Sequence, residues 1–264
     1  MKKVILFLAV VFFLTPSAAF SDISLMELYG VKLKDQSADG DMYNLYGMLN
    51  NYLGLNDDEK YANSIDLFNE RGIDPTTQWM TSGSTLIQAF NQSSYLHQVN
   101  VLSSEGVEIC KLYDQYNGGS TGEEYALEDG LILDFLLLPY TVREDGTYNY
   151  AYAWSSDPSK NANVGETYYN GDLLGIGDGG IHMIAFDITD LYNDKKGTSF
   201  NSVYMFGLED LPYNQSDFDY NDMAIIMTNL TPTVATPEPA TMLILLAGGG
   251  LVSARYLRRK RKLL

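Results

Sequence analysis

Five carboxylates, and one amide that alternates with them, lie within fourteen residues near the carboxyl end of the sequence. They are Glu209, Asp210, Asp217, Asp219, Asn221 and Asp222. No Lys or Arg occurs between Gly197 and Ala254, so no basic residue nearby in the sequence neutralises these charges. Like charges repel one another unless water screens them or a cation joins them. The cluster therefore predicts a metal site with oxygen ligands.

The spacing within this acidic cluster indicates calcium in particular. Asp217, Asp219 and Asn221 alternate as the first ligands of an EF-hand calcium loop do. The match then ends, because Asp222 replaces the glycine of position six and Thr228 stands where a bidentate Glu would bind. The sequence is therefore not an EF-hand. A turn rich in Asp and Asn, whose side chains cap backbone amides, explains the same residues without a metal.

A second, smaller group of acids lies upstream. Asp178 belongs to the glycine-rich stretch 175–180, and Asp187 follows in the next apolar run. Glycines permit a tight left-handed path that presents Asp178 at its apex. The two acids could share a cation with the main cluster, and a simple hairpin turn is the alternative interpretation.

No metalloprotease or nucleotide-binding motif accompanies these acids. The sequence lacks H-E-x-x-H and a P-loop, and its two histidines, His97 and His182, are too isolated for a zinc site. A glycosidase needs only two carboxylates across a cleft, and 34 acidic residues always provide such a pair, so a pair is no evidence for this activity. We therefore expect a protein that is not an enzyme. The alternative is a polysaccharide-active hydrolase or a lectin-like carbohydrate-binding protein.

The residues around the acidic cluster have the pattern of β-strands. Seven apolar-rich runs separated by Gly, Asp and Asn turns are predicted as strands, at 95–102, 107–113, 131–140, 148–155, 181–189, 202–208 and 223–230. In the fourth run the aromatic residues alternate, which places them on one face of a strand. Short strands without helical crossovers favour a mainly β fold, an antiparallel β-sandwich resembling a jelly roll.

Residues 20–90 differ and are predicted to form a small, mainly helical amino-terminal segment. Apolar residues recur at helical spacing over 42–53, behind Asp41 as an N-cap. A second helix is predicted over 56–72, with Glu59 in its first turn.

Both ends of the chain have targeting features. Residues 1–19 combine a cationic start, an apolar run and small residues before Phe20, which indicates a cleaved secretory signal peptide. A linker and a tail occupy residues 233–264, and residues 91–232 are then the β-sandwich domain.

The tail joins three parts in a fixed order. Pro237, Glu238 and Pro239 precede an uncharged run over 240–254, and a basic end follows. Its cations are Arg255, Arg258, Arg259, Lys260, Arg261 and Lys262. The prolines interrupt any upstream helix, the apolar run can enter a bilayer as a transmembrane helix, and the cations hold its far end in the cytoplasm.

This arrangement resembles the PEP-CTERM sorting signal of Gram-negative bacteria. The resemblance implies an exosortase-type enzyme that recognises and cleaves the tail, and a host that makes exopolysaccharide. It predicts export across the inner membrane, transient anchoring there through the tail helix, and then residence in the cell envelope or the extracellular space.

The charge of the mature part excludes some partners. Of 17 basic residues, two lie in the signal peptide and six in the tail, so nine remain against 33 of the 34 acids. Such a surface repels nucleic acid and anionic lipid, whose phosphates require cations. Cys110 is the only cysteine, so no internal disulfide can form, and stability must come from the core or from bound metal.

The stretch 207–227, which reads GLEDLPYNQSDFDYNDMAIIM, resembles the closing motif of the domain of unknown function 4114 family. The resemblance covers roughly residues 91–230. It implies a secreted or surface bacterial protein, a β-sandwich, calcium binding and no known catalytic activity. By matching position it carries over Glu209, Asp210, Asp219, Asn221 and Asp222, whereas Asp217 is suggested by spacing alone.

These features together predict a secreted, non-enzymatic protein, a calcium-stabilised structural or adhesive component of the envelope or of an exopolysaccharide biofilm matrix. Its expected partners are the exosortase-type enzyme and extracellular polysaccharide or matrix proteins.

Overall fold

The computed structural model describes residues 24–35, 43–91, 93–117, 127–161, 168–169, 172–173 and 179–233. Those up to Pro232 belong to one compact unit. Its helices are α2 (Leu25–Tyr29), α3 (Leu45–Leu53), α4 (Ser64–Arg71) and α5 (Thr189–Lys196). Its strands are β1 (Gly72–Ile73), β2 (Gln78–Asn91), β3 (Leu96–Ser103), β4 (Glu108–Asp114), β5 (Ile132–Val142), β6 (Tyr148–Tyr150), β7 (Trp154–Ser155), β8 (Tyr168–Tyr169), β9 (Asp172–Leu173), β10 (Met183–Asp187), β11 (Val203–Leu208) and β12 (Met223–Thr233).

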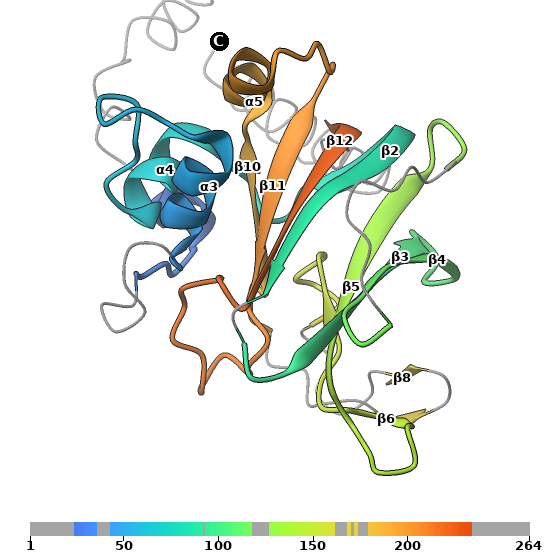
Figure 1. Ribbon diagram of the computed structural model, residues 1–264. Coiled ribbons are helices and arrows are strands. Elements are labelled where there is room, and N and C mark those ends of the chain that lie inside the picture. The colour runs from blue at the N-terminus through green and yellow to red at the C-terminus, as the bar shows by residue number, and fades with distance from the viewer. Residues whose placement is uncertain are drawn as a thin grey trace, which may run out of the picture. The chain divides into compact units, whose positions relative to one another are not determined.

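Ten of these strands form one sheet, in the order β1-β10-β11-β12-β2-β5-β3-β4, and β6 and β7 also pair with β5 (Figure 1). Each strand pair of this sheet whose residue register the structure defines is antiparallel. The predicted mainly β, antiparallel fold is therefore confirmed. The ten strands join one continuous sheet, however, whereas a sandwich has two separate large sheets, and β8 and β9 pair with each other apart from it.

The central strands β10, β11 and β12 bury both of their faces. Along β11, Val203 and Met205 belong to one apolar cluster, while Tyr204, Phe206 and Leu208 belong to another. Successive side chains of a strand point to opposite faces, so a strand covered on both sides must be apolar at every position. This explains why these segments appear in the sequence as continuous apolar runs.

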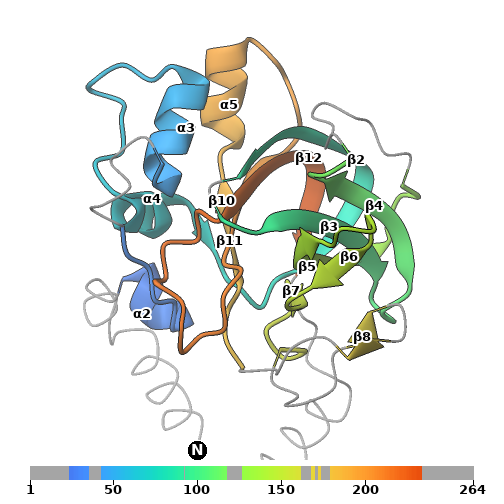
Figure 2. The same ribbon diagram turned by 60° about the horizontal axis from the view of Figure 1, so that its bottom comes forward.

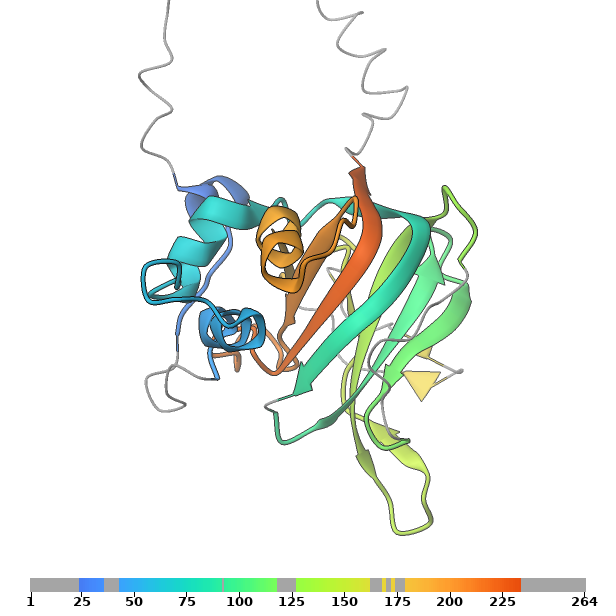
Figure 3. The same ribbon diagram turned by 45° about the horizontal axis from the view of Figure 1, so that its top comes forward.

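One face of the central strands packs against the other half of the same sheet. Phe206 of β11 and Phe135 of β5 share this core, with ring centroids 5.3 Å apart, and Val99 and Val101 of β3 also belong to it. The sheet therefore bends so that its two halves enclose a common core, as the layers of a sandwich do. Figure 3 shows β12 and β2 side by side, followed by β5.

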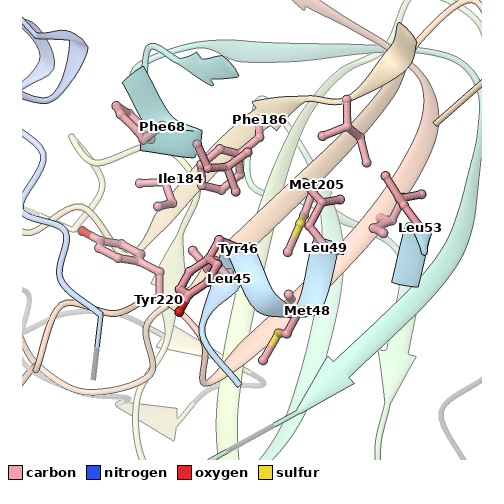
Figure 4. Close-up of a cluster of buried hydrophobic side chains, with 14 of the residues drawn as sticks. Leu45, Tyr46, Met48, Leu49, Leu53, Phe68, Ile184, Phe186, Met205 and Tyr220 are labelled. Atoms are coloured by element: carbon pink, nitrogen blue, oxygen red, sulfur yellow. The ribbon is translucent and has the colours of Figure 1, made fainter. Parts of the chain in front are cut away.

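The opposite face of the central strands packs against the helices. Leu45 and Leu49 of α3 and Phe68 of α4 are fully buried against β10 and β11 (Figure 4). The Phe68 ring meets that of Phe186 edge to face, with centroids 5.8 Å apart. The predicted helical segment therefore shares an apolar core with the sheet.

Both predicted helices are present, but each begins later than the sequence predicts. Helix α3 begins after Asn44, not after Asp41. Helix α4 is capped by Asn63, whose side chain accepts from the Asp66 amide at 2.8 Å. Glu59 accepts from the Asn56 amide at 3.0 Å, but this contact closes a separate turn. A capping contact therefore gave a false helix start, because the same contact also stabilises an isolated turn.

A long strand occupies part of the range predicted as mainly helical. Strand β2 runs from Gln78 to Asn91 and lies between β12 and β5. The run from Thr81 to Thr85 contains no apolar side chain, so hydrophobic alternation gives no strand signal there. Pairing with distant strands decides its conformation.

Two other predicted strands are shorter than their apolar runs. The run 148–155 divides into β6 and β7, because the register against β5 changes from Tyr140↔Tyr150 to Leu137↔Trp154, which leaves one extra residue on this side. The run 181–189 ends where α5 begins at Thr189.

Among the described residues, no helix has the length and apolar character needed to cross a bilayer. The predicted signal peptide and the predicted transmembrane run over 240–254 lie outside the described residues.

Gly207 of β11 allows helix α3 and the loop after β11 to approach closely. A Cβ atom at Gly207 would lie 2.8 Å from a methyl group of Leu45 and 2.9 Å from the backbone oxygen of Tyr220. Overpacking of a core costs about 1–3 kcal/mol. We therefore expect Gly207→Ala to lower the melting temperature by about 2–12 °C, at about 2–4 °C per kcal/mol for a domain of this size.

Differential scanning calorimetry measures this effect, with Asn201→Ala at an exposed bend as the control. A Gly207→Ala variant that melts with the wild-type protein would show that α3 and the loop are not in such close contact.

Candidate metal centre

The acidic cluster occupies the connection between β11 and β12. It begins at Glu209, directly after β11, and ends at Asp222, directly before β12. Leu208 and Asn221 form an isolated bridge that closes the base of this connection. Figure 2 shows it as the long orange loop that extends from the ends of the two strands. We refer to residues 209–222 as the acidic loop.

Two residues of the acidic loop have a backbone conformation that residues other than glycine rarely adopt. Phe218 and Tyr220 have φ angles of 64° and 54°. Each such residue costs on the order of 1–3 kcal/mol and persists only where its surroundings enforce it. Tyr220 is fully buried in the helix-side core, and its hydroxyl donates to the Ile181 carbonyl at 2.9 Å. The Phe218 carbonyl accepts from the Lys34 amide at 2.8 Å, so contacts on both sides fix Asp219 between them.

The loop brings all five carboxylates together in two groups. Oxygens of Glu209, Asp210 and Asp222 lie within 4.8 Å of one another, and so do oxygens of Glu209, Asp217 and Asp219. Calcium binds oxygen at about 2.3–2.6 Å, so two ligands on opposite sides of the ion lie up to about 5.2 Å apart. Each group is therefore compact enough to hold one calcium ion.

Burial makes these charges costly. The exposed fraction of Glu209 and of Asp210 is 1 %, and that of Asp219 is 2 %. The Oε2 atom of Glu209 has no hydrogen-bond partner among the described residues, and its Oε1 atom accepts a long contact of 3.3 Å from the Leu211 amide. The side chains of Ser216 and Asp222 also interact with this carboxyl group. A buried carboxylate oxygen without a partner loses the hydration that it has in the unfolded chain. A bound cation would replace this lost hydration by direct coordination of the oxygen.

Asn221 completes the set of predicted ligands. It is buried, and its side-chain nitrogen also lacks a partner within the described part of the chain. Because the oxygen and nitrogen of an amide are assigned from their contacts, a turned amide would present the oxygen there as a ligand.

The electrostatics of the loop follow from burial and mutual repulsion. Burial raises the pKa of Asp219, and the neighbouring Asp217 raises it further. Burial likewise raises the pKa of Asp222, with Asp210 and Glu209 as the next causes. Burial also raises the pKa of Glu209 itself. Without a cation, therefore, protons neutralise part of this cluster.

Basic side chains approach the loop without pairing with its carboxylates. The Lys32 ammonium lies 4.4 Å from the ring centre of Tyr213 and 5.0 Å from that of Phe218. Over the described ranges, no Lys or Arg forms an ion pair with the acidic loop. The acidic loop therefore lacks a Lys or Arg partner in the described part of the structure, just as it lacks one nearby in the sequence.

A polar network from β2 and β3 positions Asp210. The Nε2 atom of His97 lies 3.0 Å from Oδ2 of Asp210, and the Ser93 hydroxyl donates to the same oxygen. The other ring nitrogen of His97 contacts the side-chain oxygen of Asn91. The Asp210 amide in turn donates to Oδ2 of Asp222 at 2.9 Å. These contacts connect the turn between β2 and β3 to both ends of the acidic loop.

The backbone at the start of the loop is fixed by two buried rings. Trp154 donates from Nε1 to the Asp210 carbonyl at 2.9 Å, and its ring stacks on His182 with centroids 3.7 Å apart. The Glu209 amide donates to the His182 carbonyl at 3.0 Å. The ligands are therefore held in place before any ion binds.

A cavity of about 610 Å³ adjoins the cluster. Its lining residues are Tyr43, Ser93, Ser94, Tyr95, Asp210, Leu211, Asp217, Asp219, Asn221 and Asp222. Asp217 is exposed, so the cavity provides a path by which an ion could reach the buried carboxylates.

The second predicted group of acids does not join this centre. Asp178 lies outside the described residues. Asp187 accepts from the amide and the hydroxyl of Thr189, at 3.0 and 2.6 Å, and so closes the turn that leads into α5. It is absent from both carboxylate groups found in the described part of the chain.

No local pattern in the sequence indicates the residues that support the cluster. His97, Ser93, Trp154 and His182 are isolated in the sequence and belong to no motif. The contact of His97 with Asp210 spans 113 positions, so only the fold reveals it.

Comparison with known proteins bears on the tail. Residues 235–262 match the family model described as the PEP-CTERM protein-sorting motif, which includes Pro237, Glu238, Pro239 and the six predicted cations. Searches of curated proteins and of solved structures found no match. The resemblance of residues 207–227 to the domain of unknown function 4114 family stays a prediction. The chain thus carries a PEP-CTERM sorting motif, which implies processing by an exosortase-type enzyme and export to the cell surface.

Proposed function

We propose that this protein is a calcium-stabilised, non-enzymatic component of the envelope or exopolysaccharide matrix of a Gram-negative bacterium. The sorting motif at residues 235–262 supports the location. The observation that supports calcium is the buried Glu209 carboxylate, which has an unpaired oxygen and belongs to both carboxylate groups. The expected partners are extracellular polysaccharide or matrix proteins.

Calcium suits this centre better than magnesium or zinc. The ligands are oxygens from four aspartates, one glutamate and one asparagine, and calcium accepts about six to eight oxygens in irregular geometry. Magnesium dehydrates reluctantly and keeps several waters, and zinc prefers nitrogen and sulfur ligands. Extracellular calcium modules work at dissociation constants of about 10⁻⁴–10⁻³ M, an affinity compatible with a secreted protein.

The proposed ion would have a structural role. The acidic loop is strained at Phe218 and Tyr220 and carries several buried carboxylates. A cation bound between them replaces repulsion by attraction, and it links the loop to the turn between β2 and β3 through Asp210. This supports a role in holding a surface domain folded outside the cell.

A polysaccharide-active hydrolase is the alternative, and one observation favours it. The cavity is lined by Asp219, whose pKa burial raises, and by the exposed Asp217, so two carboxyl groups in different environments face the same space. A calcium ion would occupy both carboxylates and exclude that role. Hydrolysis of the host polymer that is lost in Asp219→Asn would favour the alternative.

One short sequence pattern also resembles that of serine hydrolases. Residues 118–122 read Gly-Gly-Ser-Thr-Gly, which fits G-x-S-x-G, and they lie outside the described residues. The nucleophile elbow joins a strand to a helix. The nearest described elements on either side, β4 and β5, are both strands.

Calcium should raise the melting temperature of the purified protein. A ligand that binds only the folded state stabilises it by about 2.7 kcal/mol at a hundredfold excess over its dissociation constant. That corresponds to about 5–10 °C for a domain of this size. Asp219→Asn should abolish most of the increase, measured by calorimetry after chelation and after calcium is restored.

Asp129→Asn, at an exposed turn position, is the matched control and should keep the full increase. If restored millimolar calcium leaves the wild-type melting temperature unchanged, the acidic loop is a capped turn and the calcium proposal is wrong.

The calcium effect should grow with pH. The folded protein holds the carboxyl protons of Glu209, Asp219 and Asp222 more tightly than the unfolded chain does. The unfolded chain therefore loses its protons first, near pH 4, and the metal-free protein becomes less stable as pH rises above that value. Calcium replaces these protons. Its increase in melting temperature should be larger at pH 8 than at pH 5, and an equal increase at both would contradict this account.

Processing should remove both ends of the chain. We expect the protein recovered from the cell surface to begin at Phe20 and to lack the basic end from Arg255 onward. Intact-mass spectrometry of protein from cells and from medium measures this. Surface protein that retains Arg258–Leu264 would show that the tail is not cleaved.

A further inference from the structure

We propose that the acidic loop holds two calcium ions, with the Glu209 carboxylate shared between them. The inference rests on the proposed function, because it requires that the loop binds calcium at all. The outer ion would be held by Glu209, Asp217 and Asp219, and the inner ion by Glu209, Asp210 and Asp222.

The grouping of the oxygens supports two positions. The described carboxylates form two separate sets of mutually close oxygens, and the sets have only Glu209 in common. Asp217 and Asp219 are not grouped with Asp210 and Asp222. One ion bound to either set therefore leaves the other two carboxylates without a cation. A bridging carboxylate can use one oxygen for each ion, and the buried Oε2 atom of Glu209 has no hydrogen-bond partner among the described residues.

The charge count also favours more than one divalent ion. The five carboxylates together carry five negative charges when ionised, and three of them are almost fully buried. One calcium ion would leave three negative charges in and around the buried site. A second would leave one, and the exposed Asp217 can carry it in contact with water. Buried charges that stay unpaired are strongly destabilising, so this difference favours two ions.

Polar contacts orient the carboxylates of the inner position. Asp210 uses Oδ2 for its contacts with His97 and Ser93, and Asp222 uses Oδ2 to accept from the Asp210 amide. These contacts orient the carboxylates in the folded protein, so the inner ion would connect the turn between β2 and β3 to the start of β12.

The two positions differ in access. Asp217 of the outer set is exposed beside the cavity, whereas Glu209 and Asp210 of the inner set are almost fully buried. The outer ion should exchange with solvent faster. The inner ion should depend more strongly on the folded structure around it.

Counting the bound calcium tests the proposal. The processed protein purified from cells is dialysed to equilibrium against millimolar calcium, and calcium per chain is measured by atomic emission. We expect two ions for the wild-type protein and for the Asp129→Asn control. Asp217→Asn and Asp222→Asn should each keep one ion, and Glu209→Gln should lose both.

The outcomes separate this inference from the proposed function. One ion in the wild-type protein would overturn the second site and leave calcium binding intact, whereas none would overturn both. Two ions retained in either Asp217→Asn or Asp222→Asn would contradict the assignment of that ligand set. If Glu209→Gln fails to fold by circular dichroism, the two aspartate variants decide the matter by themselves.

Discussion

The burial of β10, β11 and β12 on both faces is the constraint around which this protein is arranged. Their alternating side chains supply two cores at once, one shared with the helices and one shared with β3, β4 and β5. Removing either layer would expose a continuous apolar surface, which is unfavourable in water. The helices and the far half of the sheet are therefore parts of a single folding unit, and the connection between β11 and β12 emerges from its buried central strands.

That position explains how a strained and highly charged loop is maintained. Tyr220 lies in the helix-side core and fixes the loop from within, while Trp154 and His182 hold the backbone where the loop begins. Apolar packing and backbone hydrogen bonds thus support a conformation that its carboxylates oppose. Preorganised ligands of this kind lose little conformational entropy when an ion binds. The balance between core packing and charge repulsion is what makes the loop sensitive to cations.

The sorting motif and the acidic loop are consistent with each other although they are separate features. Exported proteins are often stabilised by disulfides, but this sequence contains one cysteine and cannot form an internal disulfide. A cation that joins distant segments has an effect similar to that of a cross-link. In the proposed function the Asp210 network with His97 and Ser93 provides that connection between β2, β3 and the loop.

Local patterns in the sequence determined the kinds of element and the chemistry of the cluster. The strand runs, the two helices, the group of carboxylates and the sorting tail are all readable over short windows, because periodicity and composition are local properties. Only the tertiary structure decided which residues meet. It placed the polar strand β2 at the centre of the sheet, brought His97 and Ser93 to Asp210 across 113 and 117 positions, and divided the carboxylates into two groups around Glu209. Such contacts depend on how the layers pack, and no short stretch of sequence contains that information.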